Sequence, residues 1–452
     1  GYNPIKVSAA YFCQDAFLNQ LGVSPTFNLL TSVMDDMRPE NKYLHLMDEQ
    51  EAITKAQALL NRQGEVAVSP LAVYRHASKA DSVQQGRPNV VLIMMESMSS
   101  KLMKHFGQSE TLTPFLDSLY TRSISFRNFY SAGIHTNHGL YATLYSFPAM
   151  MKRNLMKGSV IPHYSGLPTV LKENGYYNLF FMTHEGQYDN MNAFFRTNGY
   201  DEVFSQENYP ADKVVNSFGV QDDFLYDYAI PVLNQRAATG EPFFATLLSI
   251  SNHPPYVIPP FFHPKTSEPE TQIVEYADWA LRKFFEEARK QPWFDNTIFV
   301  LEGDHGKLVG DAECELPESY NHIPLMIYSS RIQPEEKTAF GGQVDIQPTI
   351  LGLLNIDYLQ NNFGVDLLKE ERPCMFYTAD NMVVGRNDTL LYLYNYETQQ
   401  ELTYDIGNGK LNAVPMDDSF FPLKEYSFSM LQSAEFLVKH GKTLNSIPFT
   451  QQ

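Results

Sequence analysis

The sequence predicts an α/β fold with a largely parallel central sheet. Between residues 88 and 370, short apolar runs alternate with helical patterns, and several of these runs end directly in a polar residue. Uninterrupted apolar runs are typical of parallel strands that are buried on both faces. The expected strands are Val90–Met95, Tyr177–Met182, Phe243–Ser249, Thr297–Glu302 and Pro324–Tyr328.

Helical patterns separate these strands. Residues Pro114–Thr121, Leu167–Asn174 and Tyr276–Lys290 have helical spacing, and Gly175 is a suitable helix stop before the strand at Tyr177. A loop of small residues also leads into an apolar helix at Leu140–Phe147. Strands alternating with helices indicate a sheet that is covered by helices on both faces.

The pattern divides the chain into three parts. Residues 1–87 are predicted to form a helical connector, with a helix over Asp48–Arg62 and a linker over residues 80–88. Residues 88–370 form the α/β core. Residues 371–452 form a small antiparallel β appendage, because Met375–Tyr404 alternates between apolar and polar residues, and a helix over Ser427–His440 closes the chain.

Composition excludes several classes of function. The chain has 452 residues, 43% of them hydrophobic, which is enough for a sizeable core. Its formal net charge of -18 argues against a nucleic-acid partner and against passive docking on anionic lipid. The cysteines Cys13, Cys314 and Cys374 are odd in number and far apart, so they suggest neither a disulfide framework nor a zinc cluster. No run reaches the roughly 18 apolar residues of a membrane span.

Polar residues follow four of the predicted strands. Glu96 follows the first strand, His184 the second, His253 the third, and Asp304 with His305 the fourth. Open parallel sheets bind their ligands at the carboxyl ends of the strands. We therefore expect these side chains to meet at one edge of the sheet.

Glu96, Asp304 and His305 offer two carboxylates and an imidazole for a divalent cation. Taken singly, Glu96 is better explained as a helix cap and Asp304 as the start of a turn. In Asp304-His305-Gly306, however, a charge directly after a buried strand would be costly unless it were paired, which favours the ligand interpretation.

Thr136 lies at the start of the predicted apolar helix, in a loop with the sequence Ala132-Gly133-Ile134-His135-Thr136-Asn137-His138. Such a hydroxyl is most often a helix N-cap, but the same position can place it against a phosphate, and metal coordination would make it a nucleophile. His135 and His138 are as readily explained as surface residues as they are as ligands.

Three further groups admit both a functional and a structural interpretation. His253, in a loop held by two prolines, could bind a phosphate oxygen or protonate a leaving group, and His184 could act similarly, but either could be an ordinary turn residue. His322 is a weaker candidate. The basic stretch of Lys152, Arg153 and Lys157 is expected to be solvated, with a lesser prospect of steering an anionic substrate.

Several segments together resemble the alkaline phosphatase and sulfatase superfamily over residues 88–370. The resemblance rests on Asn89–Glu96 as the first strand with its acidic ligand, on Thr113-Pro114-Phe115-Leu116-Asp117, on Tyr276-Ala277-Asp278 followed by Asp304-His305-Gly306, and on Val344–Leu351. It implies an alkaline-phosphatase-like α/β/α sandwich.

The residue at the nucleophile position indicates the branch of this superfamily. The chain lacks the Cys/Ser-x-Pro-x-Arg motif of sulfatases, and Thr136 stands at the nucleophile position. It is therefore similar to the lipoteichoic acid synthase and phosphoglycerol or phosphoethanolamine transferase branch. This resemblance implies one divalent metal ion, Mn²⁺ first and Mg²⁺ or Zn²⁺ as alternatives, held by Glu96, Thr136, Asp304 and His305. It also implies that Thr136 and His253 are catalytic, and that the substrate is bound by His184, His253, Asn137 and Asn192.

The resemblance further implies a phospholipid head-group donor, a glycan or glycolipid acceptor, and a catalytic domain outside the cell membrane that is anchored by a transmembrane region absent from this chain. A phosphodiesterase or phosphatase, a sulfuric-ester hydrolase and a non-catalytic polymer-binding protein are the alternatives. One departure concerns the head group: lipoteichoic acid synthases carry Trp and Arg after the position of His184, whereas this segment has no Trp and Arg196 comes late.

Overall fold

The structure is a computed structural model that describes residues 43–61, 69, 73, 75–77, 87–158, 160–407 and 409–445. Most of the predicted connector over residues 1–87 and most of the linker over residues 80–88 lie outside these residues. The helix predicted over Asp48–Arg62 is confirmed as α3 (Glu49–Leu60), and Asp48 caps it by accepting a hydrogen bond from the Glu51 main-chain N–H at 2.9 Å.

An eight-stranded sheet lies at the centre of the molecule, in the order β11-β3-β10-β9-β2-β8-β4-β5. All five predicted strands are confirmed, and β3, β5 and β11 add to them. Within this sheet only β10 runs antiparallel to its neighbours. The bounds are β2 (Asn89–Met95), β3 (Ile124–Tyr130), β4 (Tyr177–Phe181), β5 (Glu202–Phe204), β8 (Phe243–Leu248), β9 (Thr297–Gly303), β10 (Leu325–Tyr328) and β11 (Glu335–Gly342).

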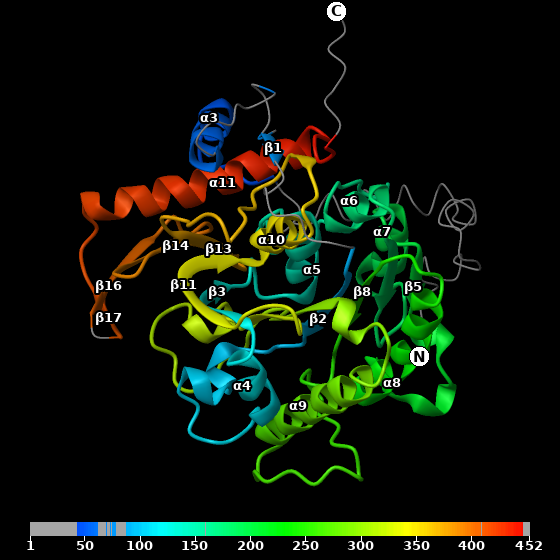
Figure 1. The fold of residues 1–452 in the computed structure, drawn as a ribbon. Coiled ribbons are helices and arrows are strands. Elements are labelled where there is room, and N and C mark those ends of the chain that lie inside the picture. Colours follow the sequence, from blue (N-terminus) through cyan, green and yellow to red (C-terminus); the bar gives the residue numbers. More distant parts are fainter. Residues whose placement is uncertain are drawn as a thin grey trace, which may run out of the picture.

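Helices cover both faces of this sheet (Figure 1). Alternate residues of β2 point into two separate cores, because successive side chains of a strand point to opposite faces. Val91 and Ile93 pack with helices of one layer, and Leu92 and Met94 pack with helices of the other. The first layer contains α4 (Pro114–Tyr120), α8 (Asp222–Ala237) and α9 (Pro269–Ala288), and the second contains α5 (Thr136–Tyr145), α6 (Leu167–Glu173) and α10 (Ile346–Leu353).

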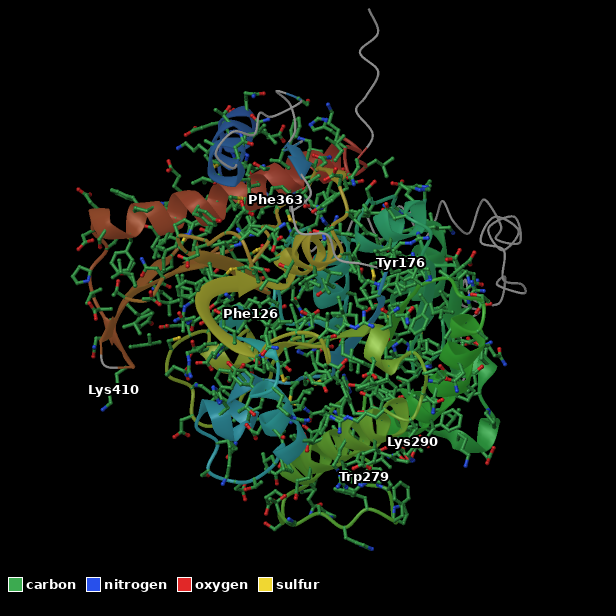
Figure 2. The ribbon with its side chains drawn as sticks, in the orientation of Figure 1. Phe126, Tyr176, Trp279, Lys290, Phe363 and Lys410 are labelled. Atoms are coloured by element: carbon green, nitrogen blue, oxygen red, sulfur yellow. The ribbon has the colours of Figure 1, made fainter. Side chains whose placement is uncertain are left out.

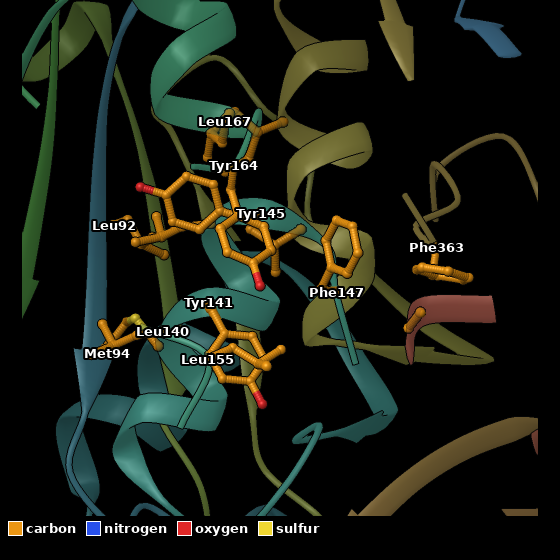
Figure 3. Packing of buried hydrophobic residues seen from close by; sticks show 14 of the residues in the cluster. Leu92, Met94, Leu140, Tyr141, Tyr145, Phe147, Leu155, Tyr164, Leu167 and Phe363 are labelled. Carbon is orange, nitrogen blue, oxygen red and sulfur yellow. The ribbon is translucent and has the colours of Figure 1, made fainter. Parts of the chain in front are cut away.

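The second core is rich in aromatic residues. Figure 3 shows Leu92 and Met94 of β2 against Leu140, Tyr141 and Tyr145 of α5. All of these residues are fully buried. This packing fixes α5 on the sheet, so it also fixes the residues at the start of that helix. The predicted α/β/α sandwich with a largely parallel sheet is thus confirmed.

Helix α9 is longer than predicted. It begins at Pro269 rather than Tyr276, because Pro is well suited to the first turn of a helix and Ile273 and Val274 continue its buried face. Its Asp278 carboxylate accepts hydrogen bonds from the main-chain N–H groups of Phe115 and Leu116, both at 2.9 Å, and so caps α4. Two of the segments that carry the family resemblance therefore meet here.

The predicted C-terminal antiparallel appendage is confirmed as a five-stranded sheet in the order β13-β14-β15-β16-β17. Its tip, at Lys410, projects away from the central sheet (Figure 2). Helix α11 (Phe421–Lys439) packs on β13 and β14 and also contacts α3. The strands are β13 (Met375–Ala379), β14 (Met382–Arg386), β15 (Leu390–Asn395), β16 (Glu401–Gly407) and β17 (Lys410–Ala413).

The appendage is bonded to the α/β core at several points. Arg386 Nη1 lies 2.7 Å from Glu318 Oε1 in the connection between β9 and β10, and the Tyr404 hydroxyl donates to Glu315 in the same connection. The Thr378 main-chain N–H donates to the Ala132 carbonyl oxygen at 2.9 Å. Whether residues 371–452 form a separate unit stays a prediction.

Smaller elements complete the fold: α7 (Met191–Thr197), the strand pair β1 (Arg75–Ala77) and β12 (Tyr358–Gln360), and the strand pair β6 (Val214–Asn216) and β7 (Gly219–Val220). Among the described residues, no helix combines the length and the apolar character that crossing a bilayer requires.

Candidate active site and metal centre

Two neighbouring strands bring the predicted acidic residues together. In the parallel pair β2 and β9, Met95 lies opposite Gly303, so Glu96 and Asp304 leave the sheet side by side. The Asp304 main-chain N–H donates to the Met95 carbonyl oxygen at 3.0 Å and extends this pairing by one residue. Both side chains are buried, with 1% and 0% exposure.

Hydrogen bonds from Ser97 hold these two carboxylates. Its main-chain N–H donates to Asp304 Oδ1 at 2.8 Å, and its hydroxyl donates to Glu96 Oε1 at 2.7 Å. Asp304 Oδ1 also accepts from the His305 main-chain N–H at 2.7 Å. Asp304 Oδ2, in contrast, is buried and accepts no hydrogen bond from the described residues.

His305 completes a three-residue cluster. Its Nε2 lies 3.7 Å from Glu96 Oε1 and 3.6 Å from Asp304 Oδ2. Its Nδ1 lies 2.7 Å from the Gly306 carbonyl oxygen. Because a carbonyl oxygen can only accept a hydrogen bond, Nδ1 carries the proton, and the lone pair of the neutral ring is on Nε2, directed at the two carboxylates.

Thr136 lies next to this cluster. Its Oγ1 is a hydrogen-bond donor to Glu96 Oε2 at 3.4 Å. Thr136 is the first helical residue of α5, and His135 occupies the N-cap position, so the interpretation of Thr136 as a cap is wrong. The helix also begins four residues earlier than predicted. The structure thus brings Glu96, Thr136, Asp304 and His305 together.

Two buried contacts hold the Thr136 segment against the end of β9. The Gln343 side chain accepts from the Ala132 main-chain N–H at 2.9 Å and donates to the carbonyl oxygens of Gly303 and Asp304 at 3.1 and 2.8 Å. At Gly139 the helix approaches the Asp304 main chain so closely that an added Cβ would collide with it. Gly139 lies before the predicted helix start at Leu140, so the sequence analysis did not predict this close approach.

The cluster fits a divalent cation. The donor atoms of Glu96, Asp304 and His305 lie within 4.8 Å of one another. Burial, and then the neighbouring Asp304 carboxylate, raise the pKa of Glu96 well above its usual value. Two adjacent buried carboxylates, one of them with an oxygen that has no partner, are costly without a compensating charge. Oxygen and imidazole donors suit Mn²⁺, Mg²⁺ or Zn²⁺.

His184 and His253 have the same arrangement as His305. His184 Nδ1 lies 3.1 Å from the Glu185 carbonyl oxygen, and His253 Nδ1 lies 2.6 Å from that of Pro254. In the neutral rings, Nε2 is therefore the free acceptor in both cases. Burial also lowers the pKa of His184. His253 lines a pocket with Phe218 and Pro255.

The predicted asparagines occupy different surroundings. Asn137 follows Thr136 on α5, and its Oδ1 is buried and accepts no hydrogen bond from the described residues. Asn192 Oδ1 accepts from Arg196 Nε at 2.7 Å, and Arg196 also donates to the Val203 carbonyl oxygen. Arg196 therefore bonds to residues close to it in the sequence. This agrees with its late position after His184. The substrate-binding roles of Asn137 and Asn192 stay predictions.

Some expectations for nearby polar residues are wrong. His138 is buried rather than on the surface, whereas His135 is exposed and lies 2.8 Å from Asp380. Arg153 is not solvated: its guanidinium group is buried against Glu435 at 2.9 Å. His322 makes no hydrogen bond to the described residues of the cluster. Its Nε2 lies 2.7 Å from the Arg127 carbonyl oxygen.

Sequence reasoning missed Ser97, Gln343 and Lys307. The Lys307 ammonium group lies 2.7 Å from Asn252 Oδ1, in the loop that also carries His253. Burial lowers the pKa of Lys307 to about 8. Its position two residues after His305 was an available signal, but its direction depends on Asn252, which is distant in sequence.

Comparisons with known proteins agree with this geometry. The family model for sulfatases matches residues 88–356. Lipoteichoic acid synthase 2 of Bacillus subtilis is 24% identical over 315 residues, which cover 63% of this chain and 47% of that protein. Lipoteichoic acid synthase 1 of the same organism is 25% identical over 350 residues, or 71% and 53%. The chain spans about half the length of these curated relatives.

Solved structures share the fold. A protein in the alkaline phosphatase superfamily from Vibrio parahaemolyticus has a TM-score of 0.79 at 26% identity, covering 89% of this chain and 99% of that one. A lipoteichoic acid synthase from Listeria monocytogenes has a TM-score of 0.68 at 21% identity, covering 78% and 92%. The chain therefore belongs to the sulfatase family, within the alkaline phosphatase superfamily, and resembles its lipoteichoic acid synthase branch.

Proposed function

We propose that the chain is a metal-dependent transferase that moves a phosphoglycerol group, or a phosphoethanolamine group, from a phospholipid to a hydroxyl of a glycan or glycolipid. The observation that carries this proposal is the Thr136 hydroxyl 3.4 Å from Glu96, beside Asp304 and His305. A hydroxyl at a metal cluster suits nucleophilic attack on phosphorus, and the likeness to lipoteichoic acid synthases supports the choice of substrate.

Glu96, Thr136, Asp304 and His305 are the residues that would hold the cation, with Mn²⁺ the expected ion. When bound, a divalent cation supplies positive charge that lowers the pKa of a hydroxyl and neutralises charge on phosphoryl oxygens. The main-chain N–H groups at the start of α5 face the same phosphoryl group, because Thr136 is the first residue of that helix.

The proposed reaction has two displacements. The Thr136 hydroxyl loses its proton to solvent, and its oxygen forms a bond to phosphorus while the bond from phosphorus to the diacylglycerol oxygen breaks. Protonated His253 donates a proton from Nε2 to that leaving oxygen. An acceptor hydroxyl then attacks the phosphorus, and the bond from phosphorus to the Thr136 oxygen breaks. The acceptor proton passes to His253, and the Thr136 oxygen regains a proton from solvent.

The two histidines would have different tasks. His184 is buried, and its Nδ1 donates to a main-chain carbonyl group, so its Nε2 is suited to accept a hydrogen bond from a glycerol hydroxyl. His253 lies at a pocket and can take up and release a proton there. Asn137 and Asn192 would add amide contacts to the head group. The domain would work at the outer surface of the cell membrane, in keeping with a phospholipid donor.

A labelled donor tests the proposal. Metal-loaded protein is incubated with a phospholipid whose head-group glycerol is labelled, with and without a glycan acceptor. We expect label on the acceptor, none with Thr136→Ala, and reduced but measurable transfer with Thr136→Ser. Thr121→Ala, at an exposed hydroxyl, is the control. Substantial transfer by Thr136→Ala would remove Thr136 from the mechanism, and release of glycerol phosphate to water alone would identify a phosphodiesterase.

A further inference from the structure

Lys307 is a cation beside the cluster that forms no ion pair among the described residues, although the charges of Glu270 and Glu96 act on it from further away. Its Nζ lies 2.7 Å from the Asn252 side-chain oxygen and 5.3 Å from the centre of the Tyr256 ring. Across the described part of the chain, no carboxylate oxygen lies within 4.0 Å of Nζ. A neutral amide and an aromatic face therefore orient this ammonium group without cancelling its charge.

Lys307 is tied to the cluster through one short chain of contacts. Asn252 Nδ2 donates to the Ser97 carbonyl oxygen at 3.3 Å. Ser97 in turn binds both Glu96 and Asp304. The segments that follow β2, β8 and β9 thus converge at the same edge of the sheet, and Lys307 shares this edge with the cluster and with His253.

Three other basic residues already have acidic partners. Lys101 lies 3.2 Å from Glu313, Arg153 lies 2.9 Å from Glu435, and Lys157 lies 2.9 Å from Asp189. These pairs leave little charge for a substrate. Lys307 differs from them because its partner is an uncharged amide.

The formal charges at the cluster indicate which class of phosphate ester Lys307 favours. A bound divalent cation would balance the formal charges of the Glu96 and Asp304 carboxylates. A phosphodiester carries one negative charge, which one ammonium group balances. A phosphomonoester carries a further charge that would have no counterpart here. This balance favours monoanionic phosphodiesters over dianionic monoesters in a chain whose net charge is already -18.

We propose that the Lys307 ammonium group binds a non-bridging phosphoryl oxygen of the donor phosphodiester and so contributes to selection of that substrate class. The assignment of a phosphodiester rests on the proposed function. The remaining N–H donors of Nζ are available for this contact, because Asn252 uses only one. A charge-assisted hydrogen bond of this kind is strong in a partly buried position.

Titration calorimetry on the metal-loaded full chain at neutral pH tests this contact without requiring turnover. The probe is glycerophosphoglycerol, a monoanionic diester. We expect Lys307→Met to weaken its binding roughly tenfold to hundredfold, and Lys307→Arg to stay within a few-fold of the natural protein. Asn252→Asp keeps Lys307 but pairs it with a carboxylate, so it should weaken binding as well. Lys101→Met, at a neutralised lysine, is the control.

The outcomes separate an anion contact from a purely structural role of Lys307. If Lys307 serves only to join two loops, Lys307→Met will lower the melting temperature and leave the dissociation constant unchanged, which overturns the proposal. Absence of diester binding by the natural protein also overturns it. Diester binding that depends on Lys307, together with no transfer from a lipid donor, refutes the transferase and keeps the anion contact. Transfer from a lipid donor with the same kcat/KM in Lys307→Met as in the natural protein supports the transferase and refutes the anion contact.

Discussion

Gly139 of α5 packs directly against the main-chain carbonyl oxygen of Asp304. A methyl group at position 139 would lie 2.2 Å from that oxygen. Thr136 is one turn away on the same helix, so this contact sets how closely the proposed nucleophile approaches the carboxylates at the end of β9. A residue without a side chain is required because the obstacle is main chain and cannot rotate away.

Replacing Gly139 with Ala tests this contact. We expect α5 to be displaced from the sheet, with a loss of about 1–3 kcal/mol in the free energy of unfolding and a larger proportional loss of kcat. Gly407→Ala is the control, because a methyl group there would meet only side-chain atoms, the nearer being Asp405 Oδ1 at 3.2 Å. Urea denaturation and transfer kinetics measure the two effects. An active and stable Gly139→Ala variant would contradict the close packing.

Gln343 should matter for rate as well as stability. Gln343→Met keeps the shape of the side chain but removes the hydrogen bonds to Ala132, Gly303 and Asp304, so we expect a loss of roughly 1–3 kcal/mol in stability and a lower kcat with little change in KM. Gln347→Met is the matched control, since this buried glutamine contacts Asn362 instead. Equal kinetic effects in both variants would show that Gln343 has no special role at the site.

Cation binding should stabilise the fold. Asp304 Oδ2 is buried and accepts no hydrogen bond within the described part of the chain, so Mn²⁺ is expected to raise the free energy of unfolding by about 2.7 kcal/mol at a hundredfold excess over its dissociation constant. A chelator should reverse the effect, and Asp304→Asn should abolish it. Glu397→Gln, at an exposed carboxylate, should respond like the natural protein. Melting temperature measured against Mn²⁺ concentration gives the answer, and a Mn²⁺ response that persists in Asp304→Asn would place the cation elsewhere.

His184 should make stability depend on pH. Burial lowers its pKa in the folded protein, so unfolding takes up a proton when the pH is below about 6.5, the ordinary value for histidine. The contribution of His184 to stability is therefore lost as the pH falls through that value and is constant above it. His184→Asn should reduce this slope by up to about 1.4 kcal/mol per pH unit. Urea denaturation between about pH 8 and pH 5 measures it, with the exposed His45→Gln as control; unchanged slopes would contradict a buried neutral imidazole.

The polar ends of buried strands were the most predictable part of the site. Glu96 and Asp304 follow apolar runs, and parallel strands deliver such residues to one edge whatever the order of the strands. Strand β3 was missed because Arg127 and Asn128 interrupt its apolar pattern, and this is the strand that leads towards Thr136. The position of Thr136 was therefore predicted from family resemblance and not from periodicity.

Residues whose direction depends on a distant partner could not be predicted. Arg153 reads as a solvated residue in sequence, but its partner Glu435 lies far along the chain and buries it. Lys307 is turned towards the loop after β8 by Asn252, and Gln343 reaches across to β9 from the segment before α10. The local sequence pattern predicts where the backbone of such a residue lies. Tertiary contacts decide which partner its side chain binds.

The hydrogen bond from the Thr378 main chain to Ala132 makes the C-terminal sheet a buttress for the loop that leads to Thr136. Arg386 and Glu318 brace the neighbouring loop after β9 in the same way. A protein cut short before β13 would keep Glu96, Thr136, Asp304 and the histidines of the candidate site, yet the loops that carry them would lose their outer support. The C-terminal sheet thus supports the geometry of the candidate site from outside the α/β core.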